Sequence, residues 1–213
     1  MNTRKLLISF SSLLFIIIIF FSSLFISIYN IDFYKNGYEK YDIYNLFGKD
    51  KTIDVTENLI GYFMEENQLD NEFFNEKEKS HLLDVKYLIK NSYKVYLMSI
   101  YFFILSLFFL LSEREFLKNI SSILFFSGIG SITLLVLAFV VYNISGFNHL
   151  FHEFHVLFFA GNYSFDPRVS NLKAMYPDGF FLDMGMLIVF NFFAGAVLSF
   201  VTGIFGERLK LKE

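Results

Sequence analysis

The stretch LLISFSSLLFIIIIFFSSLFISI, residues Leu6–Ile28, decides the fold. It contains no charged residue and is long enough to cross a bilayer as an α-helix, which takes roughly 20 apolar residues. Arg4 and Lys5 precede it, as in a secretory signal. The apolar run is nevertheless far longer than the roughly 7–15 residues of a signal core, and no A-x-A cleavage site follows it. We therefore expect an uncleaved membrane-spanning helix.

Three further apolar runs have the length of a span: about Tyr93–Leu111, Leu117–Tyr142 and Met184–Phe205. The composition agrees, because the chain is 54% hydrophobic with 31 Phe, and a soluble domain with so many phenyl rings would aggregate. We predict an all-α membrane protein, a bundle of four transmembrane helices with a small extracytoplasmic cap. The cap is expected to be helical, and the tyrosine-rich stretch Tyr38–Phe47 is compatible with short strands.

The spans divide the chain into five segments. In order, these are the first span, a cap with surface helices, the second and third spans, an extracytoplasmic or re-entrant segment with three histidines, and the fourth span with a tail. Their boundaries are 1–29, 30–92, 93–142, 143–183 and 184–213. Apolar residues at helical spacing predict cap helices over Asp54–Asn67 and Glu76–Lys90.

Basic residues in the short flanks predict the orientation in the membrane. They lie before the first span, between the second and third, and after the fourth: Arg4, Lys5, Arg114, Lys118, Arg208, Lys210 and Lys212. Since positive flanks stay in the cytoplasm, both termini are expected there. The segments 30–92 and 143–183 are then expected outside a bacterial cell membrane, together with the active site.

Charge and cysteine content narrow the function. The net charge is −3, and no basic run is interleaved with aromatic residues, so we expect no nucleic-acid partner. The chain contains no cysteine, which rules out disulfides, thiolate nucleophiles and thiolate metal ligands. We expect a monomer.

Three of the four histidines lie in FNHLFHEFHVLFF, residues 147–159. This aromatic segment is too short to span a bilayer and is expected to form a re-entrant or interfacial helix. For His149 and His152, a position at the headgroup level is the simpler explanation. His155 has apolar neighbours on both sides, and an ionisable group in such surroundings suggests a function.

A metal site is the alternative reading of these histidines. Their spacing of three residues spreads them over roughly 120° of a helix, from which they would converge on one ion. His152 and Glu153 begin like a zincin motif, but the second histidine comes one position too early for H-E-x-x-H. We therefore assign no metal ligands, and a metal-dependent membrane hydrolase stays an alternative.

Two other groups of polar residues are candidates. His81 and Asp84 are three residues apart on one helix face, where the carboxylate can orient the imidazole, or where both are simply solvated. Asn162, Asp166 and Arg168 follow His155 and offer hydrogen-bond donors or a site for a lipid headgroup. The plain alternative is that Asp166-Pro167-Arg168 forms only a turn.

Three stretches together resemble a known family. They are FHVLFFAGNYSFDPRVSNLKAMYPDGFFLD (154–183), KSHLLDVKYL (79–88) and DVTENLIGYF (54–63). They are similar to motifs of a family of bacterial four-helix integral membrane proteins whose characterised members are lipoprotein intramolecular transacylases. The resemblance spans nearly the whole chain. One departure is Tyr163, where the family often has Trp.

The resemblance implies a defined reaction that needs no cofactor. The substrate is a diacylglyceryl lipoprotein in the membrane lipid, and its sn-2 acyl chain moves to the α-amine of the N-terminal Cys. The reaction needs proton transfers, and we expect catalytic roles in them for His155 and His81. Substrate-binding or orienting roles then fall to Asp84, Asn162, Tyr163, Asp166 and Arg168. A non-enzymatic transporter or assembly factor is the remaining alternative, although a transporter should carry ionisable groups in mid-span and these spans have almost none.

Overall fold

The computed structural model describes residues 3–70, 72–111, 115–159, 161 and 163–209, whose regular secondary structure is helical, with no strand among them. In chain order the helices are α1 (Thr3–Ile28), α2 (Ile31–Lys40), α3 (Ile43–Phe47), α4 (Lys49–Phe63), α5 (Glu76–Leu111), α6 (Phe116–Phe158), α7 (Asn171–Met175) and α8 (Asp178–Leu209). The predicted all-α membrane fold is confirmed, since α1, α5, α6 and α8 are long and apolar enough to cross a membrane. The second cap helix and the second span form one continuous helix, α5.

The possibility of strands over Tyr38–Phe47 was wrong, because this stretch belongs to α2 and α3. Asn30 begins α2 by accepting hydrogen bonds from the backbone N–H groups of Asp32 and Phe33. The aromatic residues of α2 then recur at helical spacing, and the rings of Tyr34 and Tyr38 lie 6.4 Å apart. Tyrosine enrichment reflected a buried helix face here rather than a pleated sheet.

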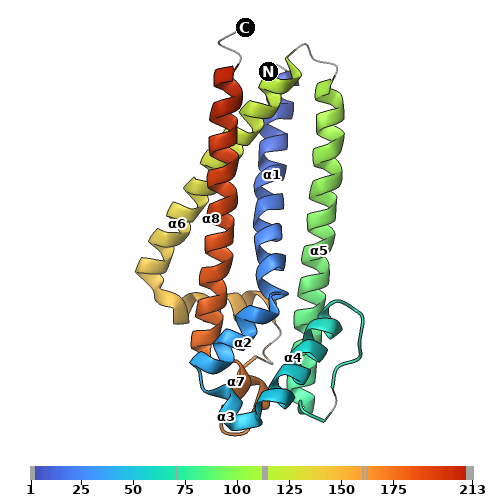
Figure 1. The fold of residues 1–213 in the computed structure, drawn as a ribbon, viewed down its shortest axis with the longest axis vertical. Helices are drawn as coiled ribbons and strands as arrows, with labels where there is room; N and C mark the ends of the chain where they lie inside the picture. Colours follow the sequence, from blue (N-terminus) through green and yellow to red (C-terminus); the bar gives the residue numbers. More distant parts are fainter. Residues whose placement is uncertain (1–2, 71, 112–114, 160, 162, 210–213) are drawn as a thin grey trace. The chain divides into compact units, whose positions relative to one another are not determined.

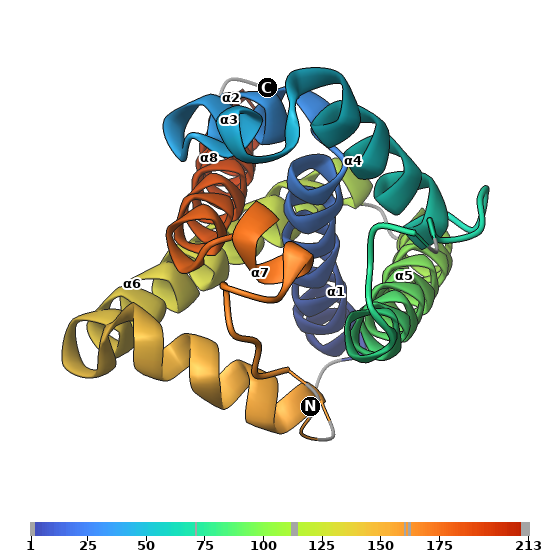
Figure 2. The same ribbon diagram turned by 90° about the horizontal axis from the view of Figure 1, so that it is seen from below.

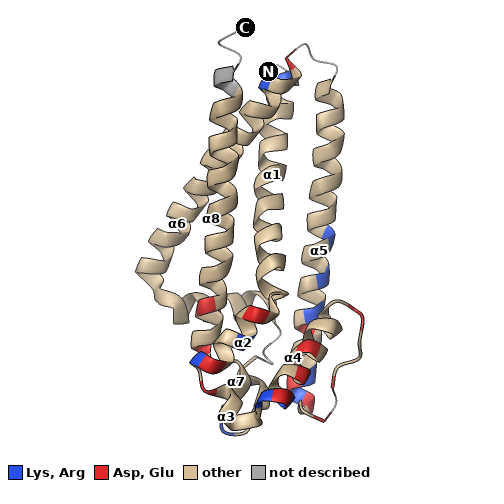
Figure 3. Ribbon diagram, in the orientation of Figure 1, with Lys and Arg blue, Asp and Glu red and all other residues tan. Residues whose placement is uncertain are grey.

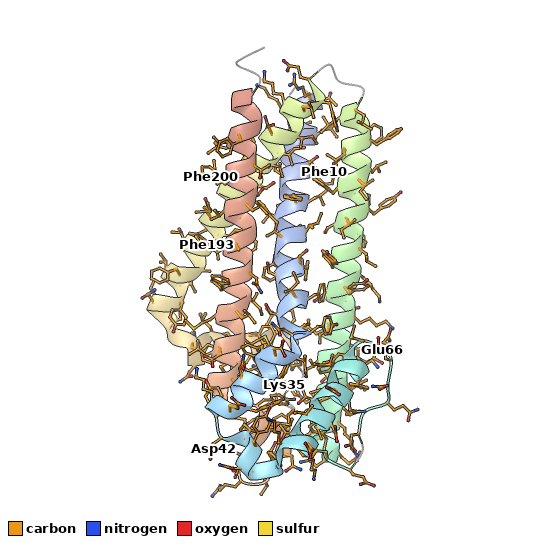
Figure 4. The ribbon with its side chains drawn as sticks, viewed as in Figure 1. Phe10, Lys35, Asp42, Glu66, Phe193 and Phe200 are labelled. Carbon is orange, nitrogen blue, oxygen red and sulfur yellow. The ribbon has the colours of Figure 1, made fainter. Side chains whose placement is uncertain are left out.

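Two compact units make up the chain. The first contains residues 1–25, 93–144 and 187–213, which are the apolar parts of α1, α5, α6 and α8 (Figure 1). Their middle stretches carry no Lys, Arg, Asp or Glu (Figure 3). Side chains such as Phe10 and Phe193 project from these helices and are about half exposed (Figure 4). Such a surface suits lipid tails, and we take these parts as the membrane-spanning segments.

Small residues allow close contact between the helices of the first unit. The hydroxyls of Ser11 and Ser106 are hydrogen-bonded at 2.8 Å, and Ser199 donates to the carbonyl of Leu124 at 2.8 Å. A Cβ on Gly128 would lie 2.6 Å from the backbone of Phe200, so only glycine permits this approach. Packing by small residues and interhelical hydroxyls is typical of helices in lipid, where the hydrophobic effect no longer drives association.

The second unit contains residues 26–92 and 145–186. It holds α2, α3, α4, α7, the charged first part of α5, the last part of α6 and the first turns of α8, seen from below in Figure 2. Its core includes a buried hydroxyl cluster. Tyr38 shares a 2.5 Å hydrogen bond with Thr56 and donates one of 3.1 Å to Tyr176. This cluster joins α2, α4 and the residue that follows α7.

Gly146 breaks α6 into two helical parts. Its φ of 71° and ψ of 162° lie in a region of backbone conformation open essentially to glycine alone. The part after the break, residues 147–158, is too short to span a bilayer and exposes Leu157 at 74%. The chain therefore changes direction immediately before the segment that carries His155.

Replacing Gly146 tests this break. We expect Gly146→Ala to lower the free energy of unfolding by about 1–3 kcal/mol, because alanine is strained at this backbone conformation. Gly185→Ala is the matched control: a Cβ added at either glycine would meet open space, but Gly185 lies in regular helix α8. Thermal unfolding of both variants in detergent provides the measurement. Equal stability of the two variants would contradict the strained turn.

Candidate functional site

His81 lies in the second turn of α5 and is only 8% exposed. The helix begins just before it with a capping box, in which Asn75 Oδ1 accepts from the Glu78 N–H at 3.0 Å and a Glu78 carboxylate oxygen accepts from the Asn75 N–H at 2.8 Å. The imidazole packs edge-on against Phe159 and Phe165, with ring centroids 4.7 and 5.4 Å away. Aromatic residues from a distant part of the sequence thus keep water from most of this ring.

His155 lies in the last turn of α6, and a backbone carbonyl fixes its tautomer. Nδ1 of His155 is 2.6 Å from the carbonyl oxygen of Phe151, one turn earlier. A carbonyl oxygen only accepts hydrogen bonds, so Nδ1 must carry the proton. Nε2 of the neutral ring is then left with its lone pair, which is the form needed in a proton acceptor.

The two imidazoles lie close together. Their ring centroids are 6.1 Å apart and their planes differ by 19°. Phe159 contacts both, at 4.7 Å from His81 and 5.3 Å from His155. The ring of Tyr163 lies 5.1 Å from His155. The predicted pair of histidines and the predicted aromatic residue therefore meet in one place within the second unit.

Both histidines belong to the parts of α5 and α6 that lie outside the membrane-spanning segments, and their surroundings favour the neutral imidazole. Burial lowers the pKa of His81 to about 4, nearby His155 and Lys77 act in the same direction, and Asp84 partly opposes them. Burial also lowers the pKa of His155, with Lys173 acting in the same direction, whereas the Phe151 carbonyl and Asp178 raise it. Near pH 7 the site therefore holds two uncharged rings.

Asp84 does not bond the ring of His81 at Nδ1. That atom is buried and has no hydrogen-bond partner among the described residues. The carboxylate acts instead through its charge, which raises the pKa of His81 as a neighbouring anion should. An orphaned polar atom in a buried ring is a group that a bound substrate can satisfy.

The remaining predicted residues lie outside this ring cluster. Asp166 and Arg168 form a two-pronged ion pair with each other in an exposed turn, closest at 2.6 Å. Asn162 lies outside the described residues. His149 is exposed, and the exposed His152 places its ring 6.1 Å from that of Tyr163. Among the described residues, no three His, Asp or Glu side chains come together as a metal site.

Sequence reasoning missed several residues of the site. Phe159 and Phe165 line the histidines, and Lys77 donates to the carbonyl of Ser164 at 2.5 Å with its Nζ 5.0 Å from the ring of Phe165. Nothing in the apolar pattern singles out these two phenylalanines among 31. The start of α5 was predictable from Asn75-x-x-Glu78, because an Asn followed three residues later by Glu is a signal for a helix start.

Each unit also has a cavity. That of the first unit has about 380 Å³ and lies between α1, α6 and α8, with an apolar lining that includes Ile17, Phe20, Leu134 and Phe192. That of the second unit has about 350 Å³ and is open, with Leu46, Phe47, Pro167 and Arg168 among its walls. The cavity of the first unit is suited to hydrocarbon chains. The cavity of the second unit combines apolar side chains with the guanidinium of Arg168.

The family assignment follows from the sequence match. Residues 9–181 match the family model for the lipoprotein intramolecular transacylase Lit. The chain belongs to this family. It is therefore an acyltransferase and a multi-pass membrane protein, as its four apolar helices require. The transporter and assembly-factor alternatives are thereby set aside.

Solved structures agree with the fold of this transacylase. The membrane integral lipoprotein intramolecular transacylase Lit from Bacillus cereus superposes with a TM-score of 0.85 at 20% sequence identity, over 100% of this chain and 99% of that one. Two structures of that protein with one histidine substituted, by alanine and by arginine, give TM-scores of 0.81 and 0.80 at the same identity. The match to the alanine variant covers 100% of this chain and 97% of that one. The match to the arginine variant covers 99% of this chain and 95% of that one. No curated protein matches the chain significantly by sequence.

The buried state of His81 predicts how the stability of this transacylase depends on pH. Its pKa is about 4 in the folded protein against an ordinary value of 6.5, so the unfolded chain binds more protons between these values. The free energy of unfolding should fall as pH falls through this window, by on the order of 2 kcal/mol, and level off below it.

Thermal unfolding of the unaltered protein and of His81→Gln, in detergent between pH 4 and 7, is the measurement. The free energy of unfolding should fall less with decreasing pH in His81→Gln than in the unaltered protein. His149→Gln, which replaces an exposed histidine, should show the full decrease. The same decline in all three proteins would refute the assignment to His81.

Proposed function

We propose that this transacylase moves the sn-2 acyl chain of the diacylglyceryl group to the α-amine of the N-terminal Cys of a lipoprotein. The product is an N-acyl lipoprotein whose glyceryl group keeps one chain. The observation that carries the proposal is the pair of neutral imidazoles whose ring centroids are 6.1 Å apart, one of which has its proton on Nδ1 and its lone pair on Nε2. Such a pair can accept a proton at one step and return it at another.

The reaction is favourable and intramolecular, so the enzyme has mainly to position the reacting groups. An ester becomes an amide, which is downhill and needs no energy source. Both reacting groups belong to one molecule, and the path from the amine nitrogen through the thioether and glyceryl atoms to the acyl carbon closes an eight-membered ring. Holding the nitrogen against the carbonyl therefore supplies much of the rate enhancement. A covalent acyl-enzyme is unnecessary, in keeping with a chain that has no Cys.

His155 is the proposed general acid and base. Nε2 takes a proton from the attacking amine as nitrogen bonds to the acyl carbon. The tetrahedral intermediate then collapses, its bond to the glyceryl oxygen breaks, and Nε2 returns the proton to that oxygen. An imidazole suits both steps because its pKa lies near neutrality, and burial keeps the ring uncharged before the reaction begins.

His81 is the proposed partner at the developing oxyanion. Its ring is neutral near pH 7 and holds a buried Nδ1 without a partner among the described residues. A hydrogen bond to the tetrahedral intermediate would satisfy the ring only when the charge develops, which is the condition for lowering a barrier. Asp84 is proposed to orient the imidazole of His81, and Asn162 is a second proposed donor.

The other predicted residues are proposed to orient the substrate. Tyr163 contacts His155 by its ring and suits the interface between lipid and water. Asp166 and Arg168 are proposed to meet the polar part of the lipoprotein. The catalytic face is proposed to be extracytoplasmic, with both termini in the cytoplasm and the protein acting as a monomer.

The test is expression in a bacterial host that makes diacyl lipoproteins, with N-terminal acylation read by mass spectrometry. The unaltered protein should yield the N-acyl lyso form. His155→Ala should reduce it by roughly 10²–10⁴-fold, the usual contribution of a general acid or base, and His81→Ala should also reduce it strongly.

His149→Ala is the matched control, since His149 lies on the same segment of α6 but is exposed. It should leave acylation unchanged. Undiminished product from either of the other variants would remove that histidine from the mechanism, and no lyso product from the unaltered protein would refute the proposed reaction.

A further inference from the structure

Glu78 is a fully buried carboxylate that the acyl-transfer steps do not use. It lies three residues before His81 on α5, and its relative exposure is 0%. A carboxylate removed from water is strongly destabilising unless its oxygens are hydrogen-bonded. Its partners therefore indicate what this residue holds together.

Three donors from two distant parts of the chain satisfy the carboxylate. Oε1 accepts from the Ser170 hydroxyl at 2.5 Å and from the Leu172 N–H at 2.9 Å, while Oε2 accepts from the Asn75 N–H at 2.8 Å. Among the described residues no Lys, Arg or His forms an ion pair with Glu78. One side chain thus joins the first turn of α5 to the first turn of α7.

Ser170 extends this connection. The same hydroxyl that donates to Glu78 accepts from the Lys173 N–H at 3.1 Å, and so caps α7. Ser170 is only 4% exposed. Because these hydrogen bonds are buried, water cannot replace a lost partner, and removing the carboxylate would leave orphaned donors at both helix starts.

The segment Tyr163–Ser170 is what this anchor restrains. Near its start it presents Tyr163 to His155 and Phe165 to His81, with ring centroids 5.1 and 5.4 Å apart. At its end Ser170 is bonded to Glu78. The hydrogen bond from Lys77 to Ser164 fastens the same segment, but this bond is exposed, so water competes for it.

We propose that Glu78 is a positioning residue for the two histidines: its buried carboxylate fixes the segment Tyr163–Ser170 to the start of α5 and so keeps Phe165 over His81. The inference rests on the proposed role of His81 in acyl transfer. Glu78 itself touches neither reacting atom. Its effect is transmitted by the phenyl ring that excludes water from the imidazole.

A purely structural role and a positioning role have different signatures. Loss of stability alone lowers the amount of active protein at every pH and leaves the titration of His81 unchanged. Loss of positioning lets water reach His81 and moves its titration upward, because burial is the main reason that its pKa is low. The charged and titratable groups that influence the ring, His155, Lys77 and Asp84, stay in place in both cases.

The experiment is an NMR titration of the histidine rings in purified full-length protein, with signals assigned by single His→Gln variants. In Glu78→Ala, the midpoint of His81 should rise by about one pH unit or more toward the ordinary value. The rate of transacylation should fall by about tenfold or more, with its acidic limb moved to higher pH. Glu78→Gln, which keeps one oxygen for Ser170 and Leu172, should show a smaller shift.

Thr56→Val is the matched control. Thr56 is also fully buried in the second unit, and it hydrogen-bonds Tyr38 rather than the segment at the histidines. It should lose stability without moving the His81 midpoint. An unchanged midpoint in folded Glu78→Ala, or an equal rise in Thr56→Val, would overturn the proposal.

Ser170→Ala covers the case in which Glu78→Ala does not fold. It removes one of the three donors and should shift His81 in the same direction by less, so an unmoved midpoint there also counts against the proposal. The titration needs no activity. Failure to find N-acyl lyso product with the unaltered protein would therefore refute the proposed function without deciding the role of Glu78.

Discussion

Hydrocarbon offers a polypeptide no hydrogen-bond partner, so a segment that enters a bilayer must satisfy its own backbone. The apolar parts of α1, α5, α6 and α8 meet this condition as helices, and their contacts use small residues such as Gly128 and hydroxyls such as Ser11. The same condition removes ionisable groups from mid-span. The proposed proton transfer accordingly uses residues of the second unit, where charged residues are concentrated.

The site is assembled from parts of the chain that are far apart in sequence. His81 comes from the start of α5 and His155 from the end of α6, and the break at Gly146 sets the direction of the segment that carries the second. Phenyl rings then enclose both imidazoles. Dry surroundings keep the rings neutral, which is the state that a proton acceptor must have before it acts.

The spans were predictable because length and hydropathy determine them almost alone. The run Leu6–Ile28 differs from α1 only at its first residues. The helices over Tyr38–Phe47 were not predictable as helices, since tyrosine favours strands and the packing that overrides this preference involves the distant Tyr176.

The candidate site, too, was predictable only in part from the sequence. His155 and His81 were identifiable because imidazoles are rare in this chain and one has apolar neighbours on both sides. Their approach to 6.1 Å, and the enclosing rings of Phe159 and Phe165, depend on tertiary contacts that a linear pattern does not contain. Glu78 is one of several charged residues near the start of α5, and only its burial in the structure sets it apart.

The partner of His155 Nδ1 is a main-chain oxygen, and this determines which changes can disturb the tautomer. In many proteins a carboxylate or amide side chain selects the tautomer of a histidine, and a single codon change abolishes the selection. A substitution of Phe151 keeps this oxygen but replaces a ring whose centroid lies 4.3 Å from that of His155. The last turns of α6 themselves therefore orient the proposed general base, a role that in other histidine sites falls to a side chain from elsewhere in the protein.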